Sequence, residues 1–315
     1  LMYYNKKNFA IFARLLVTLL PIYYIIKNID LSITFELIAN IGSPFLVSAM
    51  AVLLIQVLLM THRWKIVLDN LVIELSFKHV IHIFWIGLFF NQILPTSIGG
   101  DTIRAHYLYQ RGIGFARTAQ GVLIDRIIGL IALVVLVIIT LPLGLQLVDS
   151  YNARWGLIII LISSISVLTL LLCINTISLR FQKWVLINKL SSIMVVIKDN
   201  IFSLYPGFKL LLISLLIHLL SILAMSILAI GMQLELKIIG LLVIVPIVTL
   251  LMMLPISIAG WGIREGAMII GLGFIGVGSE NAFALSLLYG FLMLAISMPG
   301  GAIWIVSSKS GDTND

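Results

Sequence analysis

The chain has 315 residues, of which 61% are hydrophobic and 10% are charged. A soluble domain has roughly 45–50% apolar and about 25% charged residues, so this composition excludes an ordinary soluble protein. It predicts an all-α polytopic membrane protein without a soluble catalytic domain. The net charge of +7 rests on few residues, which we interpret as loop charges beside anionic lipid and not as a nucleic-acid-binding surface. The single cysteine, Cys173, excludes an intramolecular disulfide and a cysteine-rich metal site.

Apolar segments separated by polar loops are the candidate membrane elements. They cover residues 9–26, 44–60, 80–94, 118–141, 155–174, 208–231, 238–254 and 282–306. A helix over residues 80–94 would be roughly 22 Å long, short of the bilayer's hydrocarbon core of about 30 Å. Pro95, Gly99 and Gly100 follow it and predict irregular backbone at membrane depth. We expect about six full transmembrane helices, with residues 80–94 and 238–254 as the first arms of two re-entrant helical hairpins.

Residues 175–206 form a different kind of segment. Apolar residues such as Phe181, Trp184 and Met194 recur there at helical spacing among lysines and an arginine, as is typical of an interfacial amphipathic helix. A connector lying on the bilayer and a partner-binding helix both fit this pattern. We predict that residues 1–315 form a single transmembrane domain that contains this segment.

Basic residues predict the orientation of the chain in the cytoplasmic (inner) membrane. They gather at the N-terminus, in a loop with Arg63, in a loop with Arg111 and Arg117, and in residues 175–206. The positive-inside rule places these four regions, and both chain termini, on the cytoplasmic side. Because the basic loops that flank residues 80–117 are then both inside, this segment must enter the membrane and return.

Residues 94–104 (LPTSIGGDTIR) and 254–264 (LPISIAGWGIR) form an internal repeat, with seven of eleven positions identical. Each copy ends a helix with proline, continues through glycine-containing backbone and places an arginine on the first turn of a returning helix. The charge rule makes the two hairpins enter from opposite faces, as in the inverted repeats of transporters, whose broken helices meet near the midplane. The alternative is a pair of proline-kinked helices that serve packing alone.

Charged residues beside these breaks are the candidate site, since each would cost roughly 2.5–3.5 kcal/mol at a helix centre in the membrane. Arg104 and Arg264 stand at helix starts, where guanidinium and free N–H groups suit a phosphate. Asp125 is expected to neutralise one of them. The alternative is a set of buried ion pairs that hold the hairpins in place. The candidate substrate-binding residues are Ser97, Asp101, Arg104, Asp125, Arg126, Ser257, Arg264 and Glu265, and the backbone breaks are Pro95, Gly99, Gly100, Pro255, Gly260 and Gly262.

The five histidines lack the spacing of a metal-binding helix, so no metal site and no cofactor is expected. Residues 271–278 are rich in glycine, but no strand precedes them, and a nucleotide-binding loop is therefore excluded.

Residues 94–101 with Arg104, the Asp125–Arg126 pair and residues 255–266 resemble the lysylphosphatidylglycerol synthase transmembrane family, also called flippase-like. This family includes the membrane half of the bacterial multiple-peptide-resistance factor and stand-alone relatives. The resemblance covers essentially the whole chain, and Ala259 departs from it where the family usually has glycine. It implies movement of a phospholipid or related lipid between leaflets. Because the chain ends in a short polar tail after Lys309, lysine transfer from tRNA is not expected.

Three functions remain open at this point. The leading hypothesis is a non-enzymatic, flippase-like transporter of an anionic phospholipid or polyprenyl-linked lipid. Its rival is a lipid-binding accessory or scaffold protein of envelope-polymer synthesis that does not transport. A membrane-embedded transferase with Asp101 or Asp125 as base is weaker, because no nucleophile or donor site is visible. The expected partners are a membrane lipid with an anionic head group and, as candidates, a second copy of the chain or envelope-synthesis enzymes.

Overall fold

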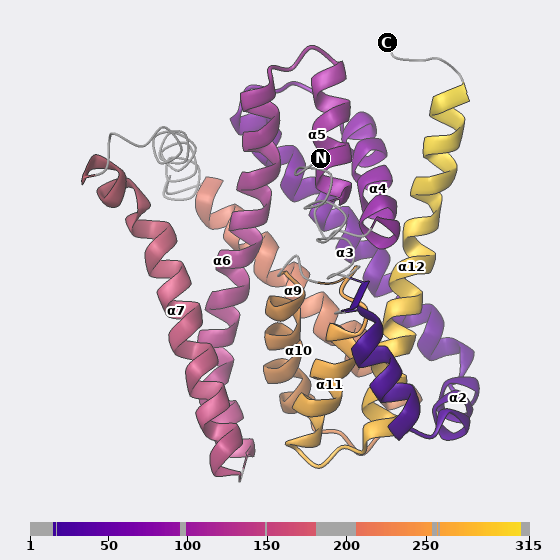
Figure 1. The fold of residues 1–315 in the computed structure, drawn as a ribbon. Coiled ribbons are helices and arrows are strands. Elements are labelled where there is room, and N and C mark those ends of the chain that lie inside the picture. Colours follow the sequence, from indigo (N-terminus) through magenta and orange to yellow (C-terminus); the bar gives the residue numbers. More distant parts are fainter. Residues whose placement is uncertain are drawn as a thin grey trace, which may run out of the picture.

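The computed structural model describes residues 15–16, 18–94, 99–148, 150–180, 206–253, 257 and 259–309, and all regular secondary structure in them is helical (Figure 1). A helix over residues 18–28 precedes the labelled helices. These are α2 (Leu31–Ala39), α3 (Ser43–Asn70), α4 (Phe77–Ile93), α5 (Gly99–Gln110), α6 (Phe115–Leu147), α7 (Tyr151–Arg180), α9 (Pro206–Gly231), α10 (Ile238–Met252), α11 (Ile263–Gly273) and α12 (Ser279–Lys309).

Four of the described helices, α3, α6, α9 and α12, are long and apolar enough to cross a membrane. The chain is therefore a multi-pass membrane protein. Of the two other full spans expected from the sequence, residues 155–174 lie within α7, and residues 9–26 fall partly outside the described residues. The predicted interfacial segment also lies outside them, except for residues 175–180, which continue α7, and Pro206, which begins α9.

Two pairs of short helices separate the long ones. α4 and α10 have 17 and 15 residues, and at 1.5 Å per residue they are roughly 25 and 22 Å long. The loop before α4 and the loop after α5 line one pocket, so this pair returns to the end of the molecule where it began. In the other pair, Gly240 near the start of α10 lies against Ile275, just after α11. Figure 1 shows the two pairs at opposite ends of the molecule.

The helices α3 to α6 and α9 to α12 form two sets of four, and each set has one long helix, two short helices and a second long helix. The helix starts in the second set follow those in the first by 161 to 164 residues: Ser43 and Pro206, Phe77 and Ile238, Gly99 and Ile263, and Phe115 and Ser279. The packing corresponds as well. The short helix α4 of the first set packs on the last helix of the second set, α12, and the short helix α10 of the second set packs on the last helix of the first set, α6. The first helices of the two sets, α3 and α9, pack on each other. This correspondence places the two short pairs in equivalent surroundings.

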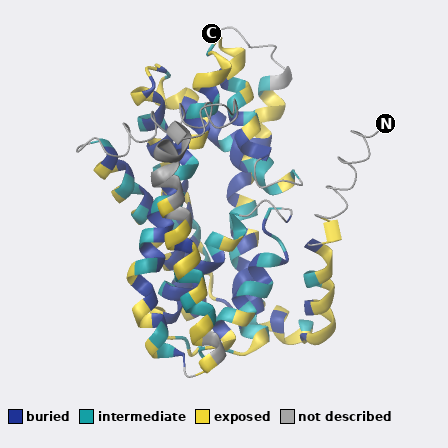
Figure 2. Ribbon diagram, turned by 60° about the vertical axis from the view of Figure 1, so that its left-hand side comes forward, coloured by how far each residue is buried: buried dark blue, intermediate teal, exposed yellow. Residues whose placement is uncertain are grey.

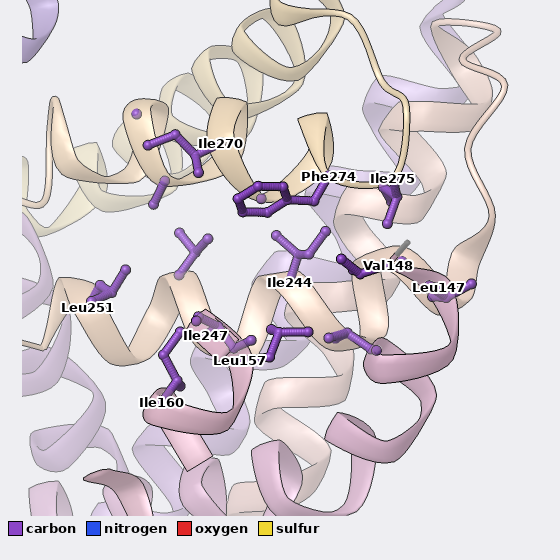
Figure 3. A pocket seen from close by; sticks show the side chains of 18 of the residues that line it. Leu147, Val148, Leu157, Ile160, Ile244, Ile247, Leu251, Ile270, Phe274 and Ile275 are labelled. Atoms are coloured by element: carbon purple, nitrogen blue, oxygen red, sulfur yellow. The ribbon is translucent and has the colours of Figure 1, made fainter. Parts of the chain in front are cut away.

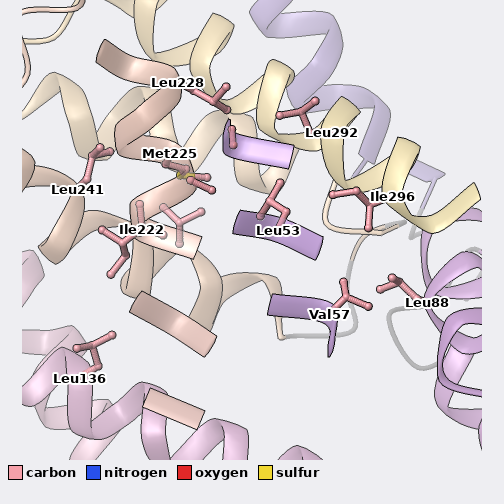
Figure 4. Packing of buried hydrophobic residues seen from close by; sticks show 14 of the residues in the cluster. Leu53, Val57, Leu88, Leu136, Ile222, Met225, Leu228, Leu241, Leu292 and Ile296 are labelled. Carbon is pink, nitrogen blue, oxygen red and sulfur yellow. The ribbon is translucent and has the colours of Figure 1, made fainter. Parts of the chain in front are cut away.

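Most of the buried apolar side chains form one cluster between these helices. Leu53 and Val57 of α3, Met225 of α9 and Ile296 of α12 belong to it (Figure 4). Exposed residues lie on the outer faces and at the ends of the helices (Figure 2). Since apolar residues are exposed along the long helices, these faces suit a hydrocarbon environment.

Candidate functional site

A polar cavity of about 280 Å³ lies among the helices of both sets. Four of the predicted site residues line it, namely Arg104, Asp125, Arg126 and Arg264. At roughly 30 Å³ for each water, the cavity has room for about nine water molecules. The two arginines of the sequence repeat, which are 160 positions apart in the chain, are thus brought to one space.

Arg104 is held by two carboxylates. Its Nη2 donates to Oδ1 of Asp101 at 2.5 Å, and its Nη1 donates to Oδ2 of Asp125 at 3.3 Å. Asp101 also accepts from Nε of Arg126 at 2.5 Å. The guanidinium of Arg104 lies over the rings of Trp64 and Phe84, 4.8 and 5.0 Å from their centroids. These cation–π contacts orient the group from its flat face.

The second oxygen of Asp125 binds Arg63, a residue that sequence reasoning missed. Arg63 Nε donates to Asp125 Oδ1 at 2.8 Å, and its Nη1 donates to the Ser214 hydroxyl at 3.0 Å. The prediction that Arg63 lies in a cytoplasmic loop is wrong, because α3 continues to Asn70. The signal was present in the sequence, since Gln56, Met60 and Arg63 are spaced by four and three residues and all line the cavity.

Arg264 has a different partner. Its Nε and Nη2 donate to Oε1 of the adjacent Glu265, at 3.0 and 2.6 Å. The other oxygen, Oε2, accepts from the backbone N–H of Gly262 at 2.6 Å and so caps the start of α11. Arg264 also lies over the Trp261 ring, 4.6 Å from its centroid. The carboxylate of Glu265 therefore fixes both the helix start and the arginine.

The backbone before α11 requires unusual conformations. Gly260 and Gly262 both have φ of +81°, which costs glycine little. Ala259 has φ of +51°, in the left-handed region where a Cβ is unfavourable. The positive φ at this position explains why the family that the chain resembles usually has glycine there.

The other predicted site residues are placed around the cavity or lie outside the described residues. Asp101, Ser257 and Glu265 are buried but do not line the cavity. The carboxylates of Asp101 and Glu265 form ion pairs with arginines that do line it. Gly99 and Gly100 begin α5, and Gly100 N–H donates to Asn91 Oδ1 at 2.9 Å. The prediction that Arg104 lies on the first turn of this helix is wrong, because the helix begins five residues before it. Ser97, Pro95 and Pro255 lie outside the described residues.

The charges around the cavity leave a positive excess. Among the described residues that line the cavity or pair with its lining, the arginines are Arg63, Arg104, Arg126 and Arg264, and the carboxylates are Asp101, Asp125 and Glu265. One positive charge is therefore unbalanced, histidine aside. A monoanion such as a phosphodiester would neutralise it, and guanidinium groups bind phosphate oxygens through paired hydrogen bonds.

The lining also contains neutral polar groups, alongside apolar side chains such as Met60 and Phe84. The neutral polar groups are Gln56, Asn91, Gln92, His218, Ser221, Thr249 and Tyr289. Some are already paired, as in the hydrogen bond of 2.7 Å from Gln56 Nε2 to the Ser221 hydroxyl. In the part of the chain that the structure describes, no group of three or more His, Cys, Asp or Glu side chains is arranged to hold a metal ion.

Comparison with known proteins identifies the family. Residues 11–301 match the model of the lysylphosphatidylglycerol synthase TM region. The chain is also similar to UPF0104 membrane protein PH1989 of Pyrococcus horikoshii, with 27% identity over 150 residues. That match covers 47% of this chain and 44% of the relative, so it spans less than half of the relative's length. No solved structure shows significant similarity to the chain. Since the family model covers most of the sequence, the chain belongs to the family of the lysylphosphatidylglycerol synthase transmembrane region.

Proposed function

We propose that this protein is a flippase-like transporter that moves an anionic phospholipid or polyprenyl-linked lipid between the leaflets of the cytoplasmic membrane. The observation that carries the proposal is that Arg104 and Arg264, from matching positions of the sequence repeat, line one cavity. The lipid phosphate would bind between them, while the hydrocarbon chains stay in the bilayer. Membership of a membrane-protein family supports this reading.

The proposal includes an inverted arrangement of two re-entrant hairpins. α4 with α5, and α10 with α11, would enter the membrane from opposite faces, because the two pairs lie at opposite ends of the molecule. Each helix pair would then bring its break to the cavity, where irregular backbone is tolerated because it faces protein and water. The basic loops favour a cytoplasmic location for both termini.

Transport requires that the arginines exchange partners. Asp101, Asp125 and Glu265 hold the guanidinium groups, and a phosphate would take over some of these hydrogen bonds. Because the carboxylates remain nearby, the head group would be held weakly enough to leave on either side. No bond in the lipid is broken, so the proposed activity is not enzymatic and needs no cofactor.

The decisive experiment is a leaflet-resolved lipid assay in vesicles containing the purified protein. Fluorescent phosphatidylglycerol in the inner leaflet should become accessible to an external quencher when the wild-type protein is present. Arg104→Gln and Arg264→Gln should each slow this exchange, while Lys65→Gln, which alters an exposed pair with Asp69, should not. Exchange at the rate of protein-free vesicles would reject transport of this lipid.

One observation favours the second candidate, a lipid-binding accessory protein of envelope-polymer synthesis that does not transport. Arg104 and Arg264 are each paired with at least one carboxylate, as in an arrangement that serves only to hold the helices. Phosphate-dependent binding without leaflet exchange would support this candidate. Its partners would be envelope-synthesis enzymes or a second copy of the chain.

A further inference from the structure

A second cavity, of about 470 Å³, lies between α6, α7, α10 and α11. Its lining is almost entirely apolar, with Leu157, Ile247 and Phe274 among the side chains that face it (Figure 3). We call it the apolar groove. Among the described residues, no charged side chain contributes to its lining, so a lipid head group would lose its hydration there without compensation.

Helix α10 forms the wall between the apolar groove and the polar cavity. Ile244, Ile247 and Leu251 line the groove, whereas Val245, Thr249 and Met252 line the cavity. Val248 lines both. Both sets recur at spacings of three or four residues, as expected for two faces of one helix.

The start of α11 brings the two spaces together a second time. Gly262 and Ile263 line the apolar groove, and the next residue, Arg264, lines the polar cavity. Adjacent residues at the start of α11 therefore border both spaces, and this is where a lipid bound at Arg264 would pass from one to the other. Three consecutive residues of the chain, 262–264, thus line both the apolar groove and the cationic site.

The size of the apolar groove fits one hydrocarbon chain. If a methylene takes about the volume of a water molecule, roughly 30 Å³, then 470 Å³ holds a chain of about fifteen carbons. A partner helix is too large, since a single helical turn with side chains, about 10–12 Å wide and 5.4 Å long, already takes up roughly 400–600 Å³. Gly156 of α7 and Gly266 of α11 line the groove, and a Cβ added at either would have nothing within 4 Å, so these glycines leave the space open.

We propose that the apolar groove binds one hydrocarbon chain of the lipid whose phosphate lies at Arg264. This inference rests on the proposed function in that it takes the lipid site to be the polar cavity. It assigns to α10 and α11 a role in recognising the tail, so a single lipid is held at its head group and along one chain. Lipids without the phosphate lack the anchor that directs their chain to the groove.

The test uses phosphatidylglycerol that carries a photoreactive diazirine midway along one acyl chain, reconstituted with the full-length protein in vesicles. Diacylglycerol with the same labelled chain serves as the lipid without phosphate. After illumination, cross-linked residues are mapped by mass spectrometry. We expect phosphatidylglycerol to label Ile247, Ile270 and Phe274 at least about tenfold more than diacylglycerol does, which corresponds to about 1.4 kcal/mol. Equal labelling by the two lipids would overturn the proposal, because it would identify the groove as a crevice for any bilayer lipid.

Substitutions refine this test. Gly266→Leu adds a side chain whose Cβ meets no neighbour, and by occupying the groove it should abolish the labelling, as should Gly156→Leu on α7. Gly273→Leu is the matched control, since Gly273 also lies on α11 with nothing near its Cβ position but does not line the groove. Arg264→Gln should reduce groove labelling by phosphatidylglycerol to the diacylglycerol level. Unchanged labelling in the folded Gly266→Leu and Gly156→Leu variants would also overturn the proposal.

The outcomes separate this inference from the transport proposal. Phosphate-dependent labelling in wild-type protein that exchanges no lipid would support the tail site and reject transport. Lipid exchange combined with phosphate-independent labelling would leave transport standing and reject the tail site.

Discussion

Arg63 of α3 and Asp125 of α6 form a buried ion pair, with 2.8 Å between Nε and Oδ1 and side chains that are 6% and 3% exposed. The other carboxylate oxygen of Asp125 accepts from Arg104. Asp125 therefore joins an arginine of the long helix α3 to the arginine of the short helix α5. Any change at Asp125 alters the surroundings of both guanidinium groups.

The first prediction concerns stability. Arg63→Met should destabilise the folded protein by about 3–5 kcal/mol. The substitution removes one of the two arginines that pair with the Asp125 carboxylate, and the carboxylate stays buried. Asp125→Asn should have a larger effect, since it weakens two pairs. Thermal unfolding in detergent micelles measures both. Lys65→Met is the control, because the pair of Lys65 with Asp69 is exposed and worth at most about 1 kcal/mol. An equal loss in Arg63→Met and Lys65→Met would contradict the prediction.

The sequence predicted several of these relationships. The breaks after residues 94 and 254 lie where the helical segments α4 and α10 end, because proline and glycine act locally on the backbone. Asp125 and Arg126 are adjacent on α6 and pair with different residues of α5, since adjacent residues on a helix diverge. Asp125 neutralises Arg104, one of the two arginines expected as its partner.

Other relationships were not predictable from the sequence. The contact of Arg63 with Asp125 depends on how α3 packs beside α6, and no local pattern specifies that packing. Arg264 and Glu265 are adjacent yet pair, because both side chains are long and they lie on the first turn of α11, where the carboxylate also caps the helix. The apolar groove is lined by residues of several helices, so it has no signature in any one of them.

The second prediction concerns the close approach of α4 and α5. A Cβ at Gly100 would come within 1.9 Å of the Gly87 carbonyl oxygen, so Gly100→Ala must push the two helices apart. Overpacking of this kind costs about 1–3 kcal/mol, and it should also displace Arg104 from the cavity. Gly114→Ala is the matched control, because nothing lies within 4 Å of its Cβ position. Unfolding temperature and phosphatidylglycerol binding should both fall in Gly100→Ala alone, and unchanged values there would contradict the close packing of these helices.

The third prediction concerns topology. Single-cysteine variants Ser76→Cys and Arg117→Cys, made with Cys173→Ala, should react with a membrane-impermeant maleimide only from the cytoplasmic side, because the loops around α4 and α5 lie together. Glu235→Cys, in the exposed turn before α10, should react only from outside. Labelling of intact and opened cells measures this. Reaction of Arg117→Cys from outside would contradict the re-entrant hairpin.

The last prediction concerns Glu265, whose Oε1 accepts both hydrogen bonds from Arg264. A lipid phosphate at Arg264 must compete with this carboxylate. Glu265→Gln removes the negative charge and retains an oxygen that can accept from the Gly262 N–H. The variant should therefore bind phosphatidylglycerol about tenfold more tightly, a change of about 1.4 kcal/mol, because the phosphate no longer displaces a charged acceptor. Its unfolding free energy should fall by about 1–3 kcal/mol, since a charged hydrogen-bond acceptor is lost from a buried site.

Two further variants show whether the effect comes from Arg264 itself. Arg264→Lys keeps the positive charge but loses the planar fork, so it should weaken phosphatidylglycerol binding relative to wild type. Glu280→Gln removes one negative charge from the first turn of α12, away from the cavity lining, and should leave the affinity unchanged. Equilibrium binding to nanodiscs with increasing phosphatidylglycerol content gives the affinities, and size-exclusion chromatography shows which variants are folded. If folded Glu265→Gln binds no more tightly than wild type, Arg264 serves the packing of α11 and does not bind phosphate, since a phosphate ligand must respond to the loss of its competitor.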